Sequence, residues 1–117
     1  MSKRILVVDN EQRSREIIAH FLREAEYDVG EADDGVSAIQ MLAKNKYDLM
    51  ICDVVMPQLG AFDVISYMKS RSLSTSVILI TGHPDLLARR GIGHLPHFAK
   101  PFNMYDLLRM VEKLLSA

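Results

Sequence analysis

The chain contains four short apolar runs, and a polar residue follows each of them at once. The runs are Ile5–Val8, Leu49–Cys52, Val77–Ile80 and His97–Ala99, and the residues that follow them are Asp9, Asp53, Thr81 and Lys100. Short apolar runs separated by helix-length segments are typical of buried parallel strands. In an open α/β sheet, ligands bind just outside the carboxyl ends of the strands. The pattern therefore predicts that two carboxylates, a hydroxyl and an ammonium lie together at one edge of a sheet.

These four groups suit two kinds of ligand. A pair of carboxylates supplies the oxygen ligands that a hard divalent cation prefers. A hydroxyl and an ammonium are hydrogen-bond donors that match the oxygens of a phosphoryl group. We therefore expect this edge of the sheet to bind a cation and a phosphoryl group.

The hydrophobic pattern predicts an α/β domain in which five strands alternate with five helices. The expected strands are Ile5–Val8, Tyr27–Ala32, Asp48–Cys52, Ser76–Ile80 and a short one around Phe98–Ala99. The expected helices are Glu11–Glu26, Val36–Asn45, Ala61–Ser70, Asp85–Arg90 and one that follows an N-cap at Asn103. The first two helices are expected to bury apolar stripes that include Ile17, Ala25 and Ala43. Right-handed crossovers then imply a parallel sheet with helices on both faces, a (βα)5 arrangement.

Composition indicates a single soluble domain. The 117 residues fit one domain, and a hydrophobic content of 49% supports a core. A formal net charge of -1 gives no electrostatic basis for binding nucleic acid or an anionic membrane. The segment Met1–Arg4 leads directly into a strand without an apolar signal region, and no run reaches transmembrane length. We expect a cytoplasmic protein whose single cysteine, Cys52, is a buried thiol.

Four motifs, in order along the chain, resemble the receiver domain of bacterial two-component response regulators. They are Ile5–Glu11, Cys52–Pro57, Thr81–Gly82 and Ala99–Phe102, and the resemblance covers essentially the whole chain, residues 1–117. Each motif lies at the end of a predicted strand, which makes the combination far more specific than any single motif. The resemblance implies a doubly wound, flavodoxin-like sheet of five parallel strands in the order 2-1-3-4-5. It also implies a site at the switch point between strands 1 and 3.

The resemblance assigns the chemistry of the site to particular residues. Asp53 matches the phospho-acceptor, whose phosphoryl group comes from a histidine kinase, a phosphotransfer protein or a small phosphodonor. Mg²⁺ is the implied cofactor, and its expected ligands are Asp9, Asn10, Asp53 and the backbone carbonyl of Val55. Lys100 is expected to pair with a phosphoryl oxygen, and the Lys100–Pro101 bond is expected to be cis. Such a protein is a signalling switch rather than an enzyme, because it catalyses only its own phosphorylation and dephosphorylation.

The resemblance also implies how the phosphoryl group changes a partner-binding surface. Thr81 is expected to donate a hydrogen bond to the phosphoryl group, and the switch aromatic corresponds to His97. Movement of His97 with Thr81 would then alter the surface that an effector domain or protein reads. An ordinary, partly exposed strand histidine is the competing interpretation of His97. The sequence contains no DNA-binding segment, so the downstream effector is left open.

Three positions in or next to the motifs bear on departures from the usual receiver pattern: Asn10, Val55 and His83. Asn10 stands where receivers carry a second acidic residue, so the site loses a charge but keeps a carbonyl oxygen, and Mg²⁺ affinity should fall. Glu11 partly replaces that charge or simply begins the helix, and a tolerated variant is the third interpretation. By resemblance to receivers, Val55 and His83 flank the route of the hydrolytic water, and His83 could either orient that water or shield the site from it. Because Val55 cannot orient water by hydrogen bonding, we expect slow autodephosphorylation.

The segment Gly82–Pro96 is the weakest part of the prediction. It carries several glycines and prolines, so its helix is expected to be short or irregular. In receivers this segment adjoins the signalling face. A short or irregular helix here would therefore change the shape of that face.

Two other functions compete with the phosphorylation switch. His83, His94 and His97 lie close together in the sequence and raise the possibility of a transition-metal site, although no matching Cys or carboxylate spacing accompanies them. The second alternative is a receiver-like scaffold that binds partners independently of phosphorylation. Asn10 and the short fourth helix favour the scaffold, whereas the retained strand-end residues favour the switch. The sequence has no nucleotide-binding glycine loop and no hydrolase motif.

Overall fold

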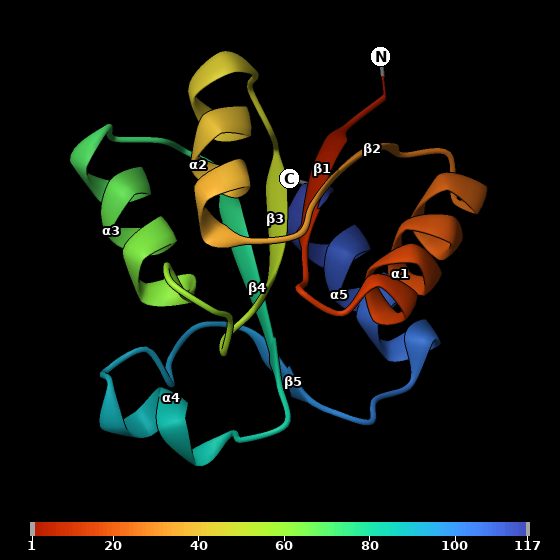
Figure 1. Cartoon of the computed structure of the whole chain (residues 1–117). Coiled ribbons are helices and arrows are strands. Elements are labelled where there is room, and N and C mark those ends of the chain that lie inside the picture. The colour runs from red at the N-terminus through yellow and green to blue at the C-terminus, as the bar shows by residue number, and fades with distance from the viewer. Residues whose placement is uncertain (1, 117) are drawn as a thin grey trace.

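A computed structural model describes residues 2–116, which form a five-stranded parallel sheet between two layers of helices (Figure 1). The sheet order is β2-β1-β3-β4-β5, which confirms the flavodoxin-like order. The strands are β1 (Arg4–Val8), β2 (Asp28–Ala32), β3 (Leu49–Asp53), β4 (Ser76–Thr81) and β5 (His97–Ala99). The helices are α1 (Gln12–Glu24), α2 (Gly35–Lys44), α3 (Ala61–Ser70), α4 (Asp85–Arg89) and α5 (Met104–Leu115).

The two faces of the sheet carry separate cores. Alternate residues of β1 point to opposite faces, with Ile5 and Val7 on one side and Leu6 and Val8 on the other. Helices α1 and α5 cover the first face, while α2, α3 and α4 cover the second (Figure 1). All four of these β1 side chains are fully buried. Burial on both faces explains why this strand is a continuous apolar run rather than an alternating one.

Strand β2 lies at one side of the sheet and is less buried than the central strands. Strand β2 pairs only with β1, and Asp28 at its start is exposed. Tyr27, which was expected to begin this strand, precedes it. Conversely, Asp53 and Thr81 are the last residues of β3 and β4 rather than the first residues beyond them.

Some helix positions predicted to be buried are exposed. Ile17 is 47% exposed, because α1 packs on the sheet through Ile18 and Leu22, which lie on a different side of the helix. Ala25 lies beyond α1 as its C-cap residue. Ala43 is exposed because Leu42 takes the inward position in α2. The predicted apolar stripes were therefore too wide.

Helix α4 is as short as its sequence predicts. It follows Pro84 and has only five residues. Gly91 just beyond it has a φ of 74°, in the left-handed region that glycine adopts without a steric penalty. Two buried side chains, Leu87 and Ile92, anchor this segment to the sheet. Among the described residues, no helix is long and apolar enough to cross a membrane.

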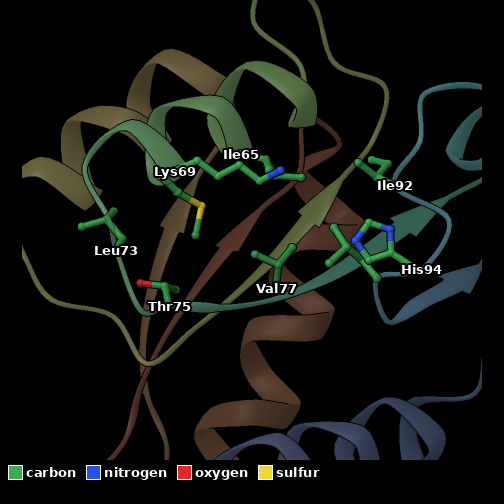
Figure 2. Close-up of a pocket in the computed structure, with 9 residues that line it drawn as sticks. Ile65, Lys69, Leu73, Thr75, Val77, Ile92 and His94 are labelled. Carbon is green, nitrogen blue, oxygen red and sulfur yellow. The ribbon is translucent and has the colours of Figure 1, made fainter.

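The irregular segment after α4 borders a small apolar cavity of about 170 Å³. Figure 2 shows Ile65 of α3, Val77 of β4 and Ile92 around it, with His94 at one side. Because Val77 lies near the beginning of β4, the cavity is at the opposite end of that strand from Thr81. This cavity is therefore separate from the edge where the strand-end residues lie.

Candidate functional site

The carboxyl-edge site, defined here as Asp9, Asp53, Thr81 and Lys100, is assembled by the parallel strand register. Val8 of β1 is aligned with Cys52 of β3, so the residues that follow them, Asp9 just beyond β1 and Asp53 at the end of β3, lie side by side. Thr81 is aligned with Ala99 of β5, and the Lys100 N–H donates to the Thr81 carbonyl at 2.8 Å. The sheet therefore brings the four predicted residues to one edge.

Lys100 connects the two carboxylates directly. Its Nζ donates to Asp53 Oδ2 at 3.2 Å and to Asp9 Oδ2 at 3.3 Å. The Lys100–Pro101 bond is cis, as predicted. The Asp9 side chain is fully buried and that of Asp53 is 14% exposed, so these ion pairs are weakly screened by solvent.

The surroundings of these charges shift their pKa values in definite directions. Burial raises the pKa of Asp53, the Lys100 ammonium lowers it and the Asp9 carboxylate raises it again, with a net increase. Partial burial lowers the pKa of Lys100, but Asp53 and Asp9 outweigh burial, so its pKa lies above the usual value. Lys100 is therefore charged at neutral pH. Burial also raises the pKa of the Cys52 thiol, which is fully buried and therefore unreactive.

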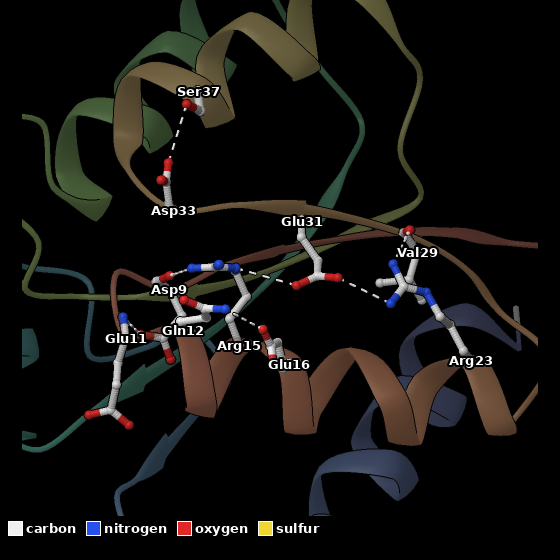
Figure 3. Close-up of polar contacts among 10 residues, drawn as sticks. All are labelled: Asp9, Glu11, Gln12, Arg15, Glu16, Arg23, Val29, Glu31, Asp33 and Ser37. Carbon is white, nitrogen blue, oxygen red and sulfur yellow. Dashed lines mark hydrogen bonds and ion pairs between the residues drawn. The ribbon is translucent and has the colours of Figure 1, made fainter.

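Asp9 is fixed by several hydrogen bonds besides its pairing with Lys100. Its N–H donates to the Ala32 carbonyl at 3.1 Å, and its Oδ1 accepts from the Glu11 N–H at 3.0 Å. Arg15 Nη1 donates to the Asp9 carbonyl at 2.8 Å (Figure 3). Sequence reasoning did not identify Arg15, whose only local signal is a basic residue in the second turn of a helix.

Asn10 and Val55 lie at the exposed mouth of the site. The Asn10 side chain is exposed next to buried Asp9. Val55 is 54% exposed, and its N–H lies 3.4 Å from Asp53 Oδ1. Asp9 and Asp53 carry two negative charges against the single positive charge of Lys100. With the amide oxygen of Asn10 and the backbone carbonyl of Val55, they could supply the oxygen-rich, net negative donor set that suits a hard divalent cation.

The side chains of Thr81 and His97 have different hydrogen-bond partners. Thr81 is fully buried, and its Oγ1 accepts a hydrogen bond from the His83 N–H at 2.9 Å. His97 is exposed, and its Nδ1 lies 2.8 Å from the Leu95 carbonyl. The two residues are linked through adjacent strands, since Thr81 is aligned with a position two residues after His97.

The histidine-rich stretch does not form a metal centre. Across residues 2–116, no group of three or more His, Cys, Asp and Glu side chains is arranged to hold a metal ion. His83, His94 and His97 therefore fail to converge, and the hypothesis of a transition-metal site is wrong for this conformation.

Comparison with known protein families identifies relatives over nearly the whole chain. The model of the response regulator receiver domain matches residues 5–112. The transcriptional regulatory protein PdtaR of Mycobacterium tuberculosis is 35% identical over 97% of this chain, and the match covers 57% of PdtaR. Response regulator MprA of Mycobacterium ulcerans is 32% identical over 98% of this chain and 51% of its own length. The chain therefore spans about half the length of these curated relatives.

Other relatives have nearly the same length as this chain. Sporulation initiation phosphotransferase F of Bacillus subtilis is 27% identical, with coverage of 98% of this chain and 95% of its own. Among solved structures, response regulator TrrA from Thermotoga maritima, in complex with Mg(2+)-BeF, superimposes with a TM-score of 0.88 at 31% identity. That superposition covers 97% of this chain and 99% of the other.

Proposed function

Because this chain belongs to the response regulator receiver family, we propose that it is a phosphorylation-controlled switch whose acceptor is Asp53. The observation that carries the proposal is the position of Lys100, whose ammonium already bridges Asp53 and Asp9. A phosphoryl group on Asp53 would replace one carboxylate with a more highly charged group beside the same ammonium. Lys100 is therefore placed to neutralise the charge that transfer brings to this position.

The proposed transfer is a nucleophilic substitution at phosphorus. An Asp53 carboxylate oxygen attacks the phosphorus and forms a new O–P bond, giving an acyl phosphate. The bond from phosphorus to the donor's histidine nitrogen, or to the carboxyl oxygen of acetyl phosphate, breaks, and the leaving group takes the electron pair. Because the attacking group must be ionised, the Lys100 charge, which favours the carboxylate form of Asp53, assists the reaction.

Mg²⁺ fits the donor set and is the proposed cofactor. Asp9, Asp53, the Asn10 amide oxygen and the Val55 carbonyl would hold it, and its charge would neutralise phosphoryl oxygens. The TrrA structure was obtained as a complex with Mg(2+)-BeF, which supports this cofactor for a relative of the same fold. Asn10 carries no charge, so the affinity of this chain for Mg²⁺ should be lower than that of a site with an aspartate there.

The proposed output is a two-state change that begins at Thr81. In the present conformation its Oγ1 accepts from the His83 N–H, which leaves the hydroxyl proton free to be donated. A phosphoryl group on Asp53 would attract that proton and draw Thr81 toward it. His97, held outward by its contact with the Leu95 carbonyl, would then move on the adjacent strand and change the surface around β5. Differential contact with the phosphoryl group is what shifts the population.

The partners follow from this role. The phosphoryl donor is a histidine kinase or a phosphotransfer protein in the cytoplasm, and the effector is a domain or protein that reads the surface around β5. Because the chain modifies only itself, its role is that of a switch and not of an enzyme acting on other substrates.

Incubation with Mg²⁺ and acetyl phosphate tests the proposal. Intact mass should show one phosphoryl adduct on the wild type and none on Asp53→Asn, and EDTA should prevent the adduct. Beryllofluoride should shift the amide resonances of Thr81 and His97 in the wild type only. Absence of both the adduct and the beryllofluoride response would reject the switch and favour the phosphate-independent scaffold.

The scaffold is the second candidate function because two observations favour it. The exposed Asn10 removes a charge from the donor set, and the five-residue α4 changes the face that phosphorylation is proposed to control. A partner that bound wild type and Asp53→Asn equally, with or without beryllofluoride, would support it.

A further inference from the structure

We infer that Arg15 is a positioning residue that fixes the metal-binding corner of the site, Asp9 and Asn10, from outside it. The inference rests on the proposed Mg²⁺ site and adds a residue to it. The hydrogen bonds of the Arg15 side chain go to the Asp9 carbonyl and to Glu31, and neither Asp53 nor Lys100 is among its partners. Its role would therefore be to orient other ligands rather than to bind the metal.

Arg15 reaches this corner from the second turn of α1. Its guanidinium spans two elements, because Nη1 donates to the Asp9 carbonyl at 2.8 Å and Nε donates to Glu31 Oε1 on β2 at 3.3 Å (Figure 3). The Arg15 side chain is only 15% exposed. A planar guanidinium held at two points has little freedom to rotate, so the carbonyl that it contacts is held as well.

The contact between Arg15 and the Asp9 carbonyl also constrains the next residue, because the peptide unit is planar. The Asp9 carbonyl and the Asn10 nitrogen share one plane, so fixing the carbonyl also fixes where the Asn10 Cα lies. On the other side of Asp9, the N–H is bonded to the Ala32 carbonyl. The backbone of Asp9 is thus held at both its N–H and its carbonyl oxygen. The Cα that carries the carboxylate side chain is therefore fixed in position. Helix α1 has no side-chain cap at Glu11, so Arg15 provides a tether that the helix terminus lacks.

Glu31 reduces the electrostatic repulsion between Arg15 and a bound cation. It pairs with Arg15 through Oε1 and with Arg23 through Oε2 at 3.1 Å. The carboxylate offsets part of the positive charge that Arg15 brings near the site. Arg23 itself is half exposed and also donates to the Val29 carbonyl at 3.0 Å. Arg23 therefore shares the ion pair with Glu31, but its hydrogen bonds go to Glu31 and Val29 and not to Asp9.

Charge and positioning predict opposite effects when Arg15 is removed. A purely electrostatic arginine repels the cation, so Arg15→Ala would bind Mg²⁺ more tightly. A positioning arginine orders the ligands, so the same change would weaken binding, by about tenfold for a contact of this kind. The sign of the change in Mg²⁺ affinity separates the two roles, whereas a change in stability alone does not.

The test compares Mg²⁺ dissociation constants of wild type, Arg15→Ala and the matched control Arg23→Ala. Binding is followed by calorimetry and by the amide resonances of Asp9, Asn10 and Asp53, and thermal unfolding is recorded for each variant. We expect Arg15→Ala to weaken Mg²⁺ binding about tenfold and Arg23→Ala to change it less than about twofold, at comparable thermal stability. Arg15→Lys keeps the positive charge but lacks the planar guanidinium, so it should also bind Mg²⁺ more weakly than wild type. This variant replaces Arg15→Ala in the test if Arg15→Ala does not fold.

Three outcomes would overturn the inference. Equal weakening in Arg15→Ala and Arg23→Ala would assign the effect to general destabilisation, and tighter binding by Arg15→Ala would leave only an electrostatic role. Either result would leave the proposed function intact if wild type binds Mg²⁺. If wild type itself fails to bind Mg²⁺, the proposed metal site is wrong and the role of Arg15 fails with it.

Discussion

The ammonium of Lys100 lies 3.2 Å from a carboxylate oxygen of Asp53, although the two residues are 47 positions apart in the sequence. The same ammonium lies 3.3 Å from buried Asp9. One cation thus holds two carboxylates that would otherwise repel each other in a poorly solvated position. The phosphoryl transfer proposed for Asp53 would therefore meet a positive charge that is already fixed beside the acceptor carboxylate.

Removal of the ammonium should slow phosphorylation while leaving the acceptor in place. Lys100→Met is expected to reduce the rate of adduct formation from acetyl phosphate by about 100-fold, in line with the loss of one preorganised donor. Intact-mass time courses measure the rate. Lys44→Met, which changes an exposed lysine at the end of α2, should react like wild type. Equal rates for Lys100→Met and Lys44→Met would contradict the role of Lys100.

The raised pKa of Asp53 predicts a pH-dependent cost to stability. Between the usual value of 3.8 and the higher folded-state pKa, the folded protein retains a proton at Asp53 that the unfolded chain has lost. The free energy of unfolding therefore falls as pH rises through this window. Asp53→Asn has no such proton, so its stability relative to wild type should increase across the window and then level off. Urea unfolding at a series of pH values measures the difference, and a constant difference would refute the prediction.

Restoration of the missing charge should strengthen cation binding. Asn10→Asp adds a carboxylate beside Asp9, and we expect the Mg²⁺ dissociation constant to fall by about tenfold or more. Calorimetric titration measures this constant. Glu11→Gln is a useful companion, because an unchanged affinity in that variant would show that Glu11 does not replace the missing charge. A wild-type affinity as tight as that of Asn10→Asp would rule out the weakening.

The phosphorylated form should persist for minutes or longer. Val55 is apolar and exposed beside Asp53, so it cannot orient an attacking water molecule by hydrogen bonding. Val55→Asn introduces an amide that can do so, and it should shorten the lifetime severalfold. Phosphate release after removal of acetyl phosphate measures the lifetime. Val36→Asn, at an exposed valine of α2, is the control, and decay of wild type within seconds would disprove the idea.

Loss of the Thr81 hydroxyl should separate phosphorylation from its output. Thr81→Val keeps the size of this buried side chain but removes its bond to the His83 N–H, at a cost to stability of about 1 kcal/mol. The variant should still form the Asp53 adduct. Its His97 ring resonances, however, should no longer respond to beryllofluoride. An unchanged His97 response would show that Thr81 does not transmit the signal.

The fold was largely predictable because its main signal is local. Central strands are buried on both faces and therefore appear as continuous apolar runs, as in β1 and β3. Two strands end one residue later than predicted. Pairing with the adjacent strand extends β3 to Asp53 and β4 to Thr81. The sheet order came from family resemblance rather than from periodicity, because alternation of strands and helices does not by itself order the strands. The predicted apolar stripe of α1 was too wide because it included Ile17, which lies on a side of the helix that the sheet does not cover.

The order of residues along the chain was enough to identify the polar residues at the ends of the buried strands and the chemical groups that they carry. Whether a polar residue follows an apolar run can be read from the local sequence. The positions of Asp9, Asp53, Thr81 and Lys100 at strand ends could therefore be recognised without a structure. Which of these groups contact one another could be known only from the folded protein. Lys100 reaches Asp9 across 91 positions, and Arg15 joins the Asp9 backbone to Glu31 on a neighbouring strand. Such contacts depend on side-chain length, direction and burial after packing, and those are set by the folded chain as a whole.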